Sequence, residues 1–228
     1  MRYLDVRTWS RRTEFVVVLL AAFGLPTVLP LLTFEAASEL AATSSEERYG
    51  RVMLYEVVVL IALGWLLYQR GWTFARVGLA PSWRSTAAGV ALAVAAYGAF
   101  LVVFFSLGAL MGLAPTVEAA PELRTADAEL SLLTIVGFSI LNPFFEELFV
   151  AGYLITVVKD GRGFWPAVSA SAALRLLYHL YQGPAAVVGI LPLGLVFGYW
   201  YARTGRLWPL IVAHALFDAV ALSATRVA

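Results

Sequence analysis

Long apolar stretches separated by short polar segments run through most of this chain. A helix needs about 20 residues to cross a bilayer. Seven stretches have this character, and they lie near residues 14–34, 53–69, 85–114, 131–158, 165–183, 184–202 and 208–224. The third stretch is long enough to contain a break, which leaves eight spans as the alternative. The pattern predicts an all-α fold: a polytopic membrane helix bundle with seven transmembrane helices.

Basic residues are distributed unequally between the two sides that these spans define. If the N-terminus is cytoplasmic, the cytoplasmic segments hold Arg2, Arg7, Arg11, Arg12, Arg70, Arg76, Arg84, Lys159, Arg162, Arg203 and Arg206. The opposite side then holds Arg48, Arg51, Arg124 and Arg226, and Arg175 is left within the membrane. Cytoplasmic segments of membrane proteins are enriched in Lys and Arg. We therefore predict a cytoplasmic N-terminus.

Composition narrows the class of protein. Hydrophobic residues make up 61% of the 228 positions and charged residues 14%, which excludes an ordinary soluble domain. The net charge of +1 and the lack of a basic run give no indication of nucleic-acid binding, and without cysteine there is no disulfide or thiolate metal site. The basic start resembles a signal peptide, but its apolar run continues to about Phe34 with no small-residue cleavage pattern. We expect a retained first span.

Two parts of the chain differ in their polar content. Residues 1–130 are interpreted as N-terminal transmembrane helices with an interfacial segment at residues 70–85, which is basic and aromatic. Residues 131–228 are interpreted as a catalytic helix bundle, because nearly all ionisable residues inside apolar stretches lie there. The exception is Glu56, which is interpreted as an acid near a span end or paired with a neighbour.

Six ionisable residues interrupt the apolar stretches of the second half. They form three pairs: Glu146 with Glu147, Arg175 with His179, and His214 with Asp218. His179 and His214 are the only two histidines of the chain. Charged groups at bilayer depth cost several kcal/mol or more, so they usually face a bundle interior and serve a function. This pattern predicts an intramembrane active site.

Helical spacing indicates which of these side chains can share a task. Neighbouring residues on a helix point about 100° apart, so one of Glu146 and Glu147 can face a cavity while the other makes a structural contact. Residues four apart lie on one face, as His214 and Asp218 do. We expect three helices to bring Glu146, His179, His214 and Asp218 around one cavity near the membrane midplane.

Asn142 and Pro143 precede the glutamates and should disturb the helix. Proline lacks an amide hydrogen and crowds the preceding turn. Asn142 is a favourable N-cap, and proline is favoured at the first helical position. One interpretation is a helix that restarts here and places Glu146 near its positive N-terminal end. The alternative is a simple proline kink.

Three segments resemble the three motifs of a known family, in the same order and with similar separations. The segments are EELFVAGYL, LRLLYHLYQG and IVAHALFDAV, within about residues 130 to 222. They are similar to the motifs of the CPBP family of intramembrane proteases, which includes the CAAX prenyl endopeptidases and the lysostaphin-resistance-like, bacteriocin-processing proteins of bacteria. Two positions differ from the family pattern: Ala151 replaces an arginine, and Arg175 replaces a phenylalanine.

The resemblance implies a mechanism in which Glu146 and His179 activate a water molecule. His214 and its partner Asp218 would then support the oxyanion of the tetrahedral intermediate. Asparagine is common at the last position, so we expect Asp218 to orient or charge His214 instead of donating a hydrogen bond. A metalloprotease is the alternative, in which zinc binds Glu146, His179 and His214. We favour the glutamic endopeptidase without a cofactor.

The two departures from the family pattern suggest a relocated positive charge. A lone buried carboxylate at Glu147 and a lone Arg175 would both be costly. We therefore predict that Arg175 reaches across to Glu147 and forms a buried, bidentate ion pair. The alternative is that Arg175 binds backbone carbonyls or Asp218.

These observations predict an intramembrane endopeptidase that cuts a membrane-associated peptide or protein, in CAAX-like processing or in the maturation of a bacteriocin or other peptide. Its partners are that substrate and the lipid bilayer, with no nucleic acid, and its expected location is the bacterial cytoplasmic membrane. No oligomeric state is predicted. One alternative is a non-catalytic immunity or partner protein in the membrane. A proton-coupled transporter is less favoured, because transporters commonly have repeated halves and the polar residues here lie in one half.

Overall fold

A computed structural model describes residues 6–24, 27, 45–110, 112, 130–179 and 184–224, and in these ranges the fold is all-α. Its longer elements are α1 (Arg11–Leu19), α4 (Ser45–Gln69), α5 (Trp83–Leu110), α6 (Leu132–Glu146), α7 (Leu154–Arg162), α8 (Phe164–Tyr178), α9 (Pro184–Thr204) and α10 (Trp208–Ala224). A 3-10 turn, η1 (Val6–Thr8), precedes α1, and a π-helical turn, η2 (Leu20–Gly24), follows it. A second π-helical segment, η4 (Glu147–Tyr153), joins α6 to α7.

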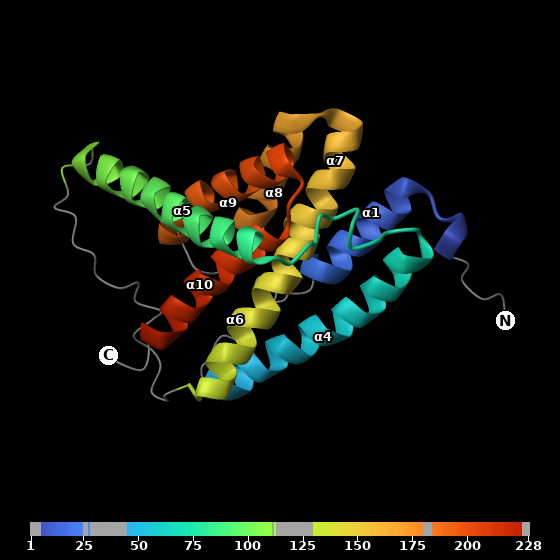
Figure 1. Ribbon diagram of the computed structural model, residues 1–228, viewed down its shortest axis with the longest axis horizontal. Helices are drawn as coiled ribbons and strands as arrows, with labels where there is room; N and C mark the ends of the chain where they lie inside the picture. The colour runs from blue at the N-terminus through green and yellow to red at the C-terminus, as the bar shows by residue number, and fades with distance from the viewer. Residues whose placement is uncertain are drawn as a thin grey trace.

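The rod formed by α6, η4 and α7 runs through the middle of the molecule (Figure 1). Helix α4 packs along α6 on one side, and α10 packs against both α6 and α5 on the other. Helices α8 and α9 pack on each other, and α8 also contacts α7. This arrangement surrounds the junction of α6 and η4 with helices from distant parts of the sequence.

Four helices in this part of the chain are long and apolar enough to cross a membrane: Glu46–Gln69, Trp83–Leu110, Leu132–Arg162 and Val187–Thr204. Large apolar side chains are exposed on them, for example Ile61 on α4 and Val94 on α5. Such a surface is stable only against an apolar medium. The protein is therefore an integral membrane protein, as its composition predicted.

Two further predicted spans are short helices. Helix α10 has 17 residues and covers the predicted range 208–224, whereas α8 has 15 residues, because it ends at Tyr178 and not near residue 183. At 1.5 Å per residue, α8 is only about 22 Å long, less than the roughly 30 Å hydrocarbon thickness. Helix α5 is unbroken from Trp83 to Leu110, so no break divides that span within these residues. Parts of the predicted spans at 14–34, 85–114 and 165–183 lie outside the described residues.

The predicted restart at Pro143 is wrong. Helix α6 begins at Leu132, where the Ser131 side chain accepts a hydrogen bond from the Thr134 amide, and it continues through Pro143 to Glu146. Asn142 is therefore an interior residue of α6 and caps no helix. The irregularity occurs after the proline, where the helix widens into the π-helical segment η4. Such segments are rare and often occur at functional sites.

Close helix packing depends on glycine in one contact between α5 and α10. A Cβ atom placed on Gly89 would lie 2.6 Å from Val212 Cβ and 2.8 Å from the Pro209 carbonyl oxygen. Only a residue without a side chain permits this approach. Small residues have this role in many membrane helix bundles.

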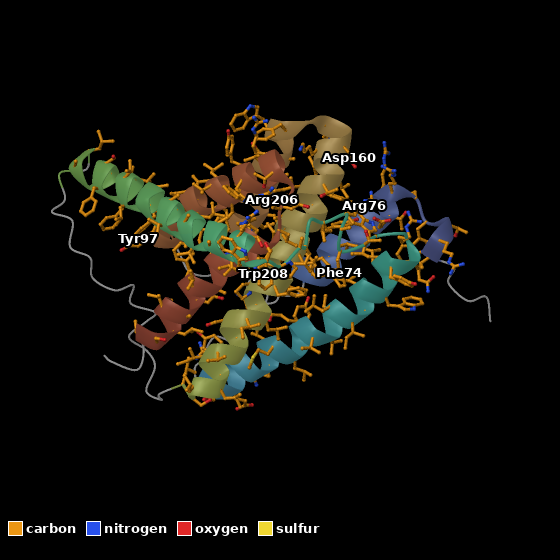
Figure 2. The ribbon with its side chains drawn as sticks, in the orientation of Figure 1. Phe74, Arg76, Tyr97, Asp160, Arg206 and Trp208 are labelled. Carbon is orange, nitrogen blue, oxygen red and sulfur yellow. The ribbon has the colours of Figure 1, made fainter. Side chains whose placement is uncertain are left out.

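The segment predicted to be interfacial packs against the turn between α9 and α10. The Leu207 amide donates a 3.0 Å hydrogen bond to the Gly78 carbonyl oxygen. Gly78 has a positive φ of 68°, and a Cβ there would lie 1.6 Å from the Gly205 carbonyl oxygen, so position 78 requires glycine. Figure 2 labels Phe74 and Arg76 in this segment, and Arg206 and Trp208 near the start of α10.

A buried polar network ties the N-terminal helix to the rest of the protein. Glu14 on α1 accepts hydrogen bonds from Arg70 Nε at 2.6 Å, from Trp72 Nε1 at 3.0 Å and from the Tyr153 hydroxyl at 3.2 Å. These partners lie just after α4 and at the end of η4. The network therefore joins the N-terminal region to the central rod.

We expect Glu14→Gln to destabilise the protein by about 1.5–3 kcal/mol, the usual range for hydrogen bonds to charged groups. Thermal unfolding of the purified protein in detergent measures this loss. The matched control is Arg51→Gln, which breaks the exposed Arg51–Glu47 pair and should cost less than about 1 kcal/mol. Equal effects of the two substitutions would contradict the role of the network.

Candidate active site

The two adjacent glutamates lie at the junction of α6 and η4, and both are buried. As their spacing predicted, they have different hydrogen-bond partners. Glu147 is completely buried and accepts a hydrogen bond from Arg175 Nη2 at 2.5 Å, and its other oxygen, Oε1, lies 2.8 Å from His214 Nδ1. The Glu147 carboxylate thus links α8 and α10 to the central rod.

The predicted contact between Arg175 and Glu147 is confirmed, but its form differs. One hydrogen bond joins Nη2 to Glu147, and Nη1 lies 3.8 Å from Glu146 Oε2, so the guanidinium spans both glutamates instead of binding one in a bidentate manner. The two glutamates point about 100° apart on the helix. The planar guanidinium of Arg175 therefore lies near one carboxylate oxygen of each. The Arg175 side chain packs closely against Gly194 on α9. A Cβ atom at position 194 would lie only 3.1 Å from Arg175 Cδ.

Glu146 has a hydrogen-bond partner that was not among the predicted site residues. The Tyr178 hydroxyl, on the last residue of α8, donates a 2.5 Å hydrogen bond to Glu146 Oε2. His214 Nε2 lies 4.0 Å from the same oxygen. Tyr178 directly precedes His179, and this position in the second motif is the only signal the sequence offers for it.

His179 lies at the C-terminal end of α8, next to this cluster. Its Nδ1 is 2.9 Å from the Arg175 carbonyl oxygen. A carbonyl oxygen only accepts, so Nδ1 donates and Nε2 is the nitrogen that can take up a proton. The His179 ring centroid is 4.4 Å from that of Tyr178, and the charges of Glu146 and His214 act on its imidazole.

His214 is hydrogen-bonded to a different carboxylate from the one expected to orient it. Asp218 was predicted to orient or charge His214, and its Oδ1 is 3.6 Å from His214 Nε2, which is beyond normal hydrogen-bond length but within ion-pair distance. Glu147 binds Nδ1 instead. Asp218 Oδ2 accepts a 3.0 Å hydrogen bond from Asn142 Nδ2, so Asn142 positions the Asp218 carboxylate.

The alternative zinc site would use Glu146, His179 and His214. Among the residues described, no group of three or more His, Cys, Asp or Glu side chains is already arranged to hold a metal. Glu147 binds Nδ1 of His214, so Nε2, which lies 4.0 Å from Glu146 Oε2, is the nitrogen of this ring that is left for another partner.

The fold and this cluster define a class: a helical membrane protein with a buried group of acidic residues, histidines and one arginine where three helices meet. Residues 128–220 match the family model described as type II CAAX prenyl endopeptidase, Rce1-like. This range contains α6 to α9 and most of α10, and with them the seven residues predicted for the site. The chain thus contains an Rce1-like domain of the CPBP family at residues 128–220. No curated protein and no solved structure matches the chain.

Proposed function

We propose that this protein is an intramembrane endopeptidase that hydrolyses a peptide bond with a water molecule activated by Glu146. The observation that carries the proposal is the contrast between the two glutamates. Glu147 is held by Arg175 and His214, whereas within the described residues Glu146 accepts a hydrogen bond at one oxygen alone, from Tyr178. Its second oxygen is then available to accept a proton from water. The membership of this region in a protease family supports the same activity.

In this mechanism Glu146 is the general base. It removes a proton from the water, the resulting hydroxide attacks the peptide carbonyl carbon, and Glu146 returns the proton to the departing amine. The Tyr178 hydrogen bond fixes the rotamer of the carboxylate. His179 lies beside Tyr178, and we assign it to binding the same water through Nε2.

His214 is proposed to stabilise the oxyanion. In its charged form it donates from Nδ1 to Glu147 and directs Nε2 toward Glu146 and Asp218, which lie within 4.0 Å. A donor held in place before the reaction stabilises the developing negative charge without reorganisation. Glu147 and Arg175 hold His214 and the central rod in position, and Asn142 holds Asp218.

The remaining assignments follow from this function. The substrate is a membrane-associated peptide or protein, processed as a CAAX-like tail or as a bacteriocin or other peptide precursor. The protein would lie in a bacterial cytoplasmic membrane with seven transmembrane helices and a cytoplasmic N-terminus. Residues 131–228 would carry the chemistry, and residues 1–130 would support it. The proposed mechanism uses side chains and water alone, so a chelator should leave hydrolysis unchanged.

The direct test is hydrolysis of membrane-anchored peptides by the purified protein in liposomes. Internally quenched peptides with and without a prenylated C-terminal cysteine provide two substrate classes. New peptide amino termini, identified by mass spectrometry, would support the function. An immunity protein or a transporter would produce none.

Tyr178→Phe should lower the turnover number while the protein remains folded. The substitution removes the hydroxyl that holds Glu146 Oε2, and a hydrogen bond to a charged group contributes about 1.5–3 kcal/mol. If this energy is needed in the transition state, the rate falls roughly tenfold to hundredfold. Tyr201→Phe is the control, because the Tyr201 hydroxyl bonds Thr156 and backbone carbonyls away from Glu146. Equal turnover in the Tyr178→Phe and Tyr201→Phe proteins would contradict the assignment.

A further inference from the structure

Glu56 is a buried acid in the half of the chain outside the family match. It lies on α4, is only 3% exposed, and its Oε2 atom has no hydrogen-bond partner in the described part of the protein. Burying a carboxyl oxygen without a partner is costly, and most buried polar atoms have one. The mechanism above does not use Glu56, so its position calls for a separate explanation.

Contacts between α4 and α6 show where Glu56 lies along the central rod. Tyr49 stacks edge-on against Phe138, with ring centroids 4.8 Å apart, and a Cβ on Gly137 would lie 3.5 Å from Met53 Sδ. Tyr49, Met53 and Glu56 are four and three residues apart and so share one face of α4.

Further along, Tyr55 contacts Phe145, with ring centroids 6.4 Å apart. Helices α4 and α6 therefore run side by side in the same direction. Glu56, which directly follows Tyr55 and lies one turn beyond Met53, is level with the end of α6.

Polar residues lie on the last turns of α6, near the level of Glu56. Ser139, Asn142 and Glu146 are three and four residues apart and share one face of the helix. All three are buried, and Ser139 Oγ, like Glu56 Oε2, has no hydrogen-bond partner in this part of the chain. The charges of Glu146, Asp218 and His214 act on Glu56. Ser139 Oγ lies about two helical turns before Glu146, whereas the carboxyl group of Glu56 lies within electrostatic range of the proposed catalytic group.

We propose that Glu56 is a fourth carboxylate of the active site and accepts a hydrogen bond in the enzyme–substrate complex. The donor is a peptide N–H of the substrate or the water that Glu146 activates. The inference rests on the proposed function and extends the site to a residue from the N-terminal half. It explains why a costly acid lies in an otherwise apolar span, since its partner arrives with the substrate.

The test compares Glu56→Met with Glu56→Gln in the liposome assay. Methionine has a similar length but accepts no strong hydrogen bond, so Glu56→Met should lower kcat/KM at least tenfold. Its unfolding temperature should be equal or higher, because an unpartnered buried carboxyl group is removed. Glutamine keeps a carbonyl acceptor, so Glu56→Gln should retain most of the activity. A rise in KM alone identifies the substrate N–H as the donor, and a fall in kcat alone identifies the water.

The neighbouring Tyr55→Phe substitution is the matched control. Its hydroxyl bonds the Ala21 carbonyl oxygen at 2.5 Å, so its loss should lower stability and leave kcat/KM unchanged. The proposal is overturned if Glu56→Met keeps activity within twofold, if it loses activity and stability together, or if Glu56→Gln is as inactive as Glu56→Met. Failure of the proposed function looks different, because the unsubstituted protein itself would then release no product, and the inference would fail with it.

Discussion

Glu146→Gln should abolish detectable hydrolysis and leave the fold intact. A positioned general base contributes about 10²- to 10⁴-fold to the rate, and glutamine cannot remove a proton from water. Its carbonyl oxygen can still accept the hydrogen bond that Tyr178 donates to Glu146. The expected result is a loss of turnover of at least about a hundredfold, with an unfolding temperature close to that of the unsubstituted protein. Steady-state hydrolysis and thermal unfolding of the same samples provide both measurements.

Glu147→Gln is the matched control for this substitution. The two positions are adjacent and carry the same side chain, but Glu147 is held by Arg175 and His214 and is fully buried. Its neutralisation should lower the unfolding temperature, and activity should fall as stability falls. Continued hydrolysis by the Glu146→Gln protein would show that Glu146 is not the general base.

Arg175→Phe should cause the largest loss of stability. Removing one partner of a buried ion pair typically costs about 3–5 kcal/mol, because the other charge stays buried. Here Glu147 would lose the 2.5 Å hydrogen bond from Arg175 Nη2, at a fully buried position. A marked fall of the unfolding temperature in detergent, together with poor yield from membranes, is the expected result.

Adding Ala151→Arg to Arg175→Phe should recover much of this loss. The double substitution recreates the family pattern, with an arginine four residues after the second glutamate and phenylalanine before the histidine. Position 151 lies in η4 on nearly the same face as Glu147, so a new guanidinium there can reach the carboxylate. Ala151→Arg alone is the control, because it adds a second positive charge beside Glu147 and should not stabilise the protein. If the double variant is no more stable than Arg175→Phe, the positive charge of Arg175 does not replace the family's arginine.

Glu146 and Glu147 show what could be predicted from the sequence alone. The 100° angle between neighbouring helical residues predicted different partners for Glu146 and Glu147, and the structure gives them Tyr178 and Arg175 respectively. The cost of isolated buried charges predicted the Arg175–Glu147 contact. Both arguments depend only on local helix geometry and on the sign of the charges, which the sequence contains.

The hydrogen-bond partners of Asp218 and Asn142 could not be predicted in this way. Four-residue spacing placed Asp218 on the same face as His214, but the hydrogen-bond partner of His214 is Glu147, and Asp218 accepts a hydrogen bond from Asn142. Glu147 Oε1 lies 2.8 Å from His214 Nδ1 and Asp218 Oδ1 lies 3.6 Å from Nε2, a difference that leaves only the Glu147 contact at hydrogen-bond length. That difference depends on how α6 and α10 are rotated against each other, which spacing within one helix does not specify.

Sequence by itself determined the class of this protein: an all-α membrane protein in which the ionisable residues inside apolar stretches lie mostly in the second half. It did so because burial in lipid is a property of composition and segment length, and because charge in lipid is too costly to occur without a use. Only the tertiary structure decided that α8 stops at Tyr178, that Tyr178 holds Glu146, and that Glu56 on α4 lies level with the end of α6. These features depend on the depth and rotation at which separate helices pack, and those follow from contacts between residues far apart in the chain.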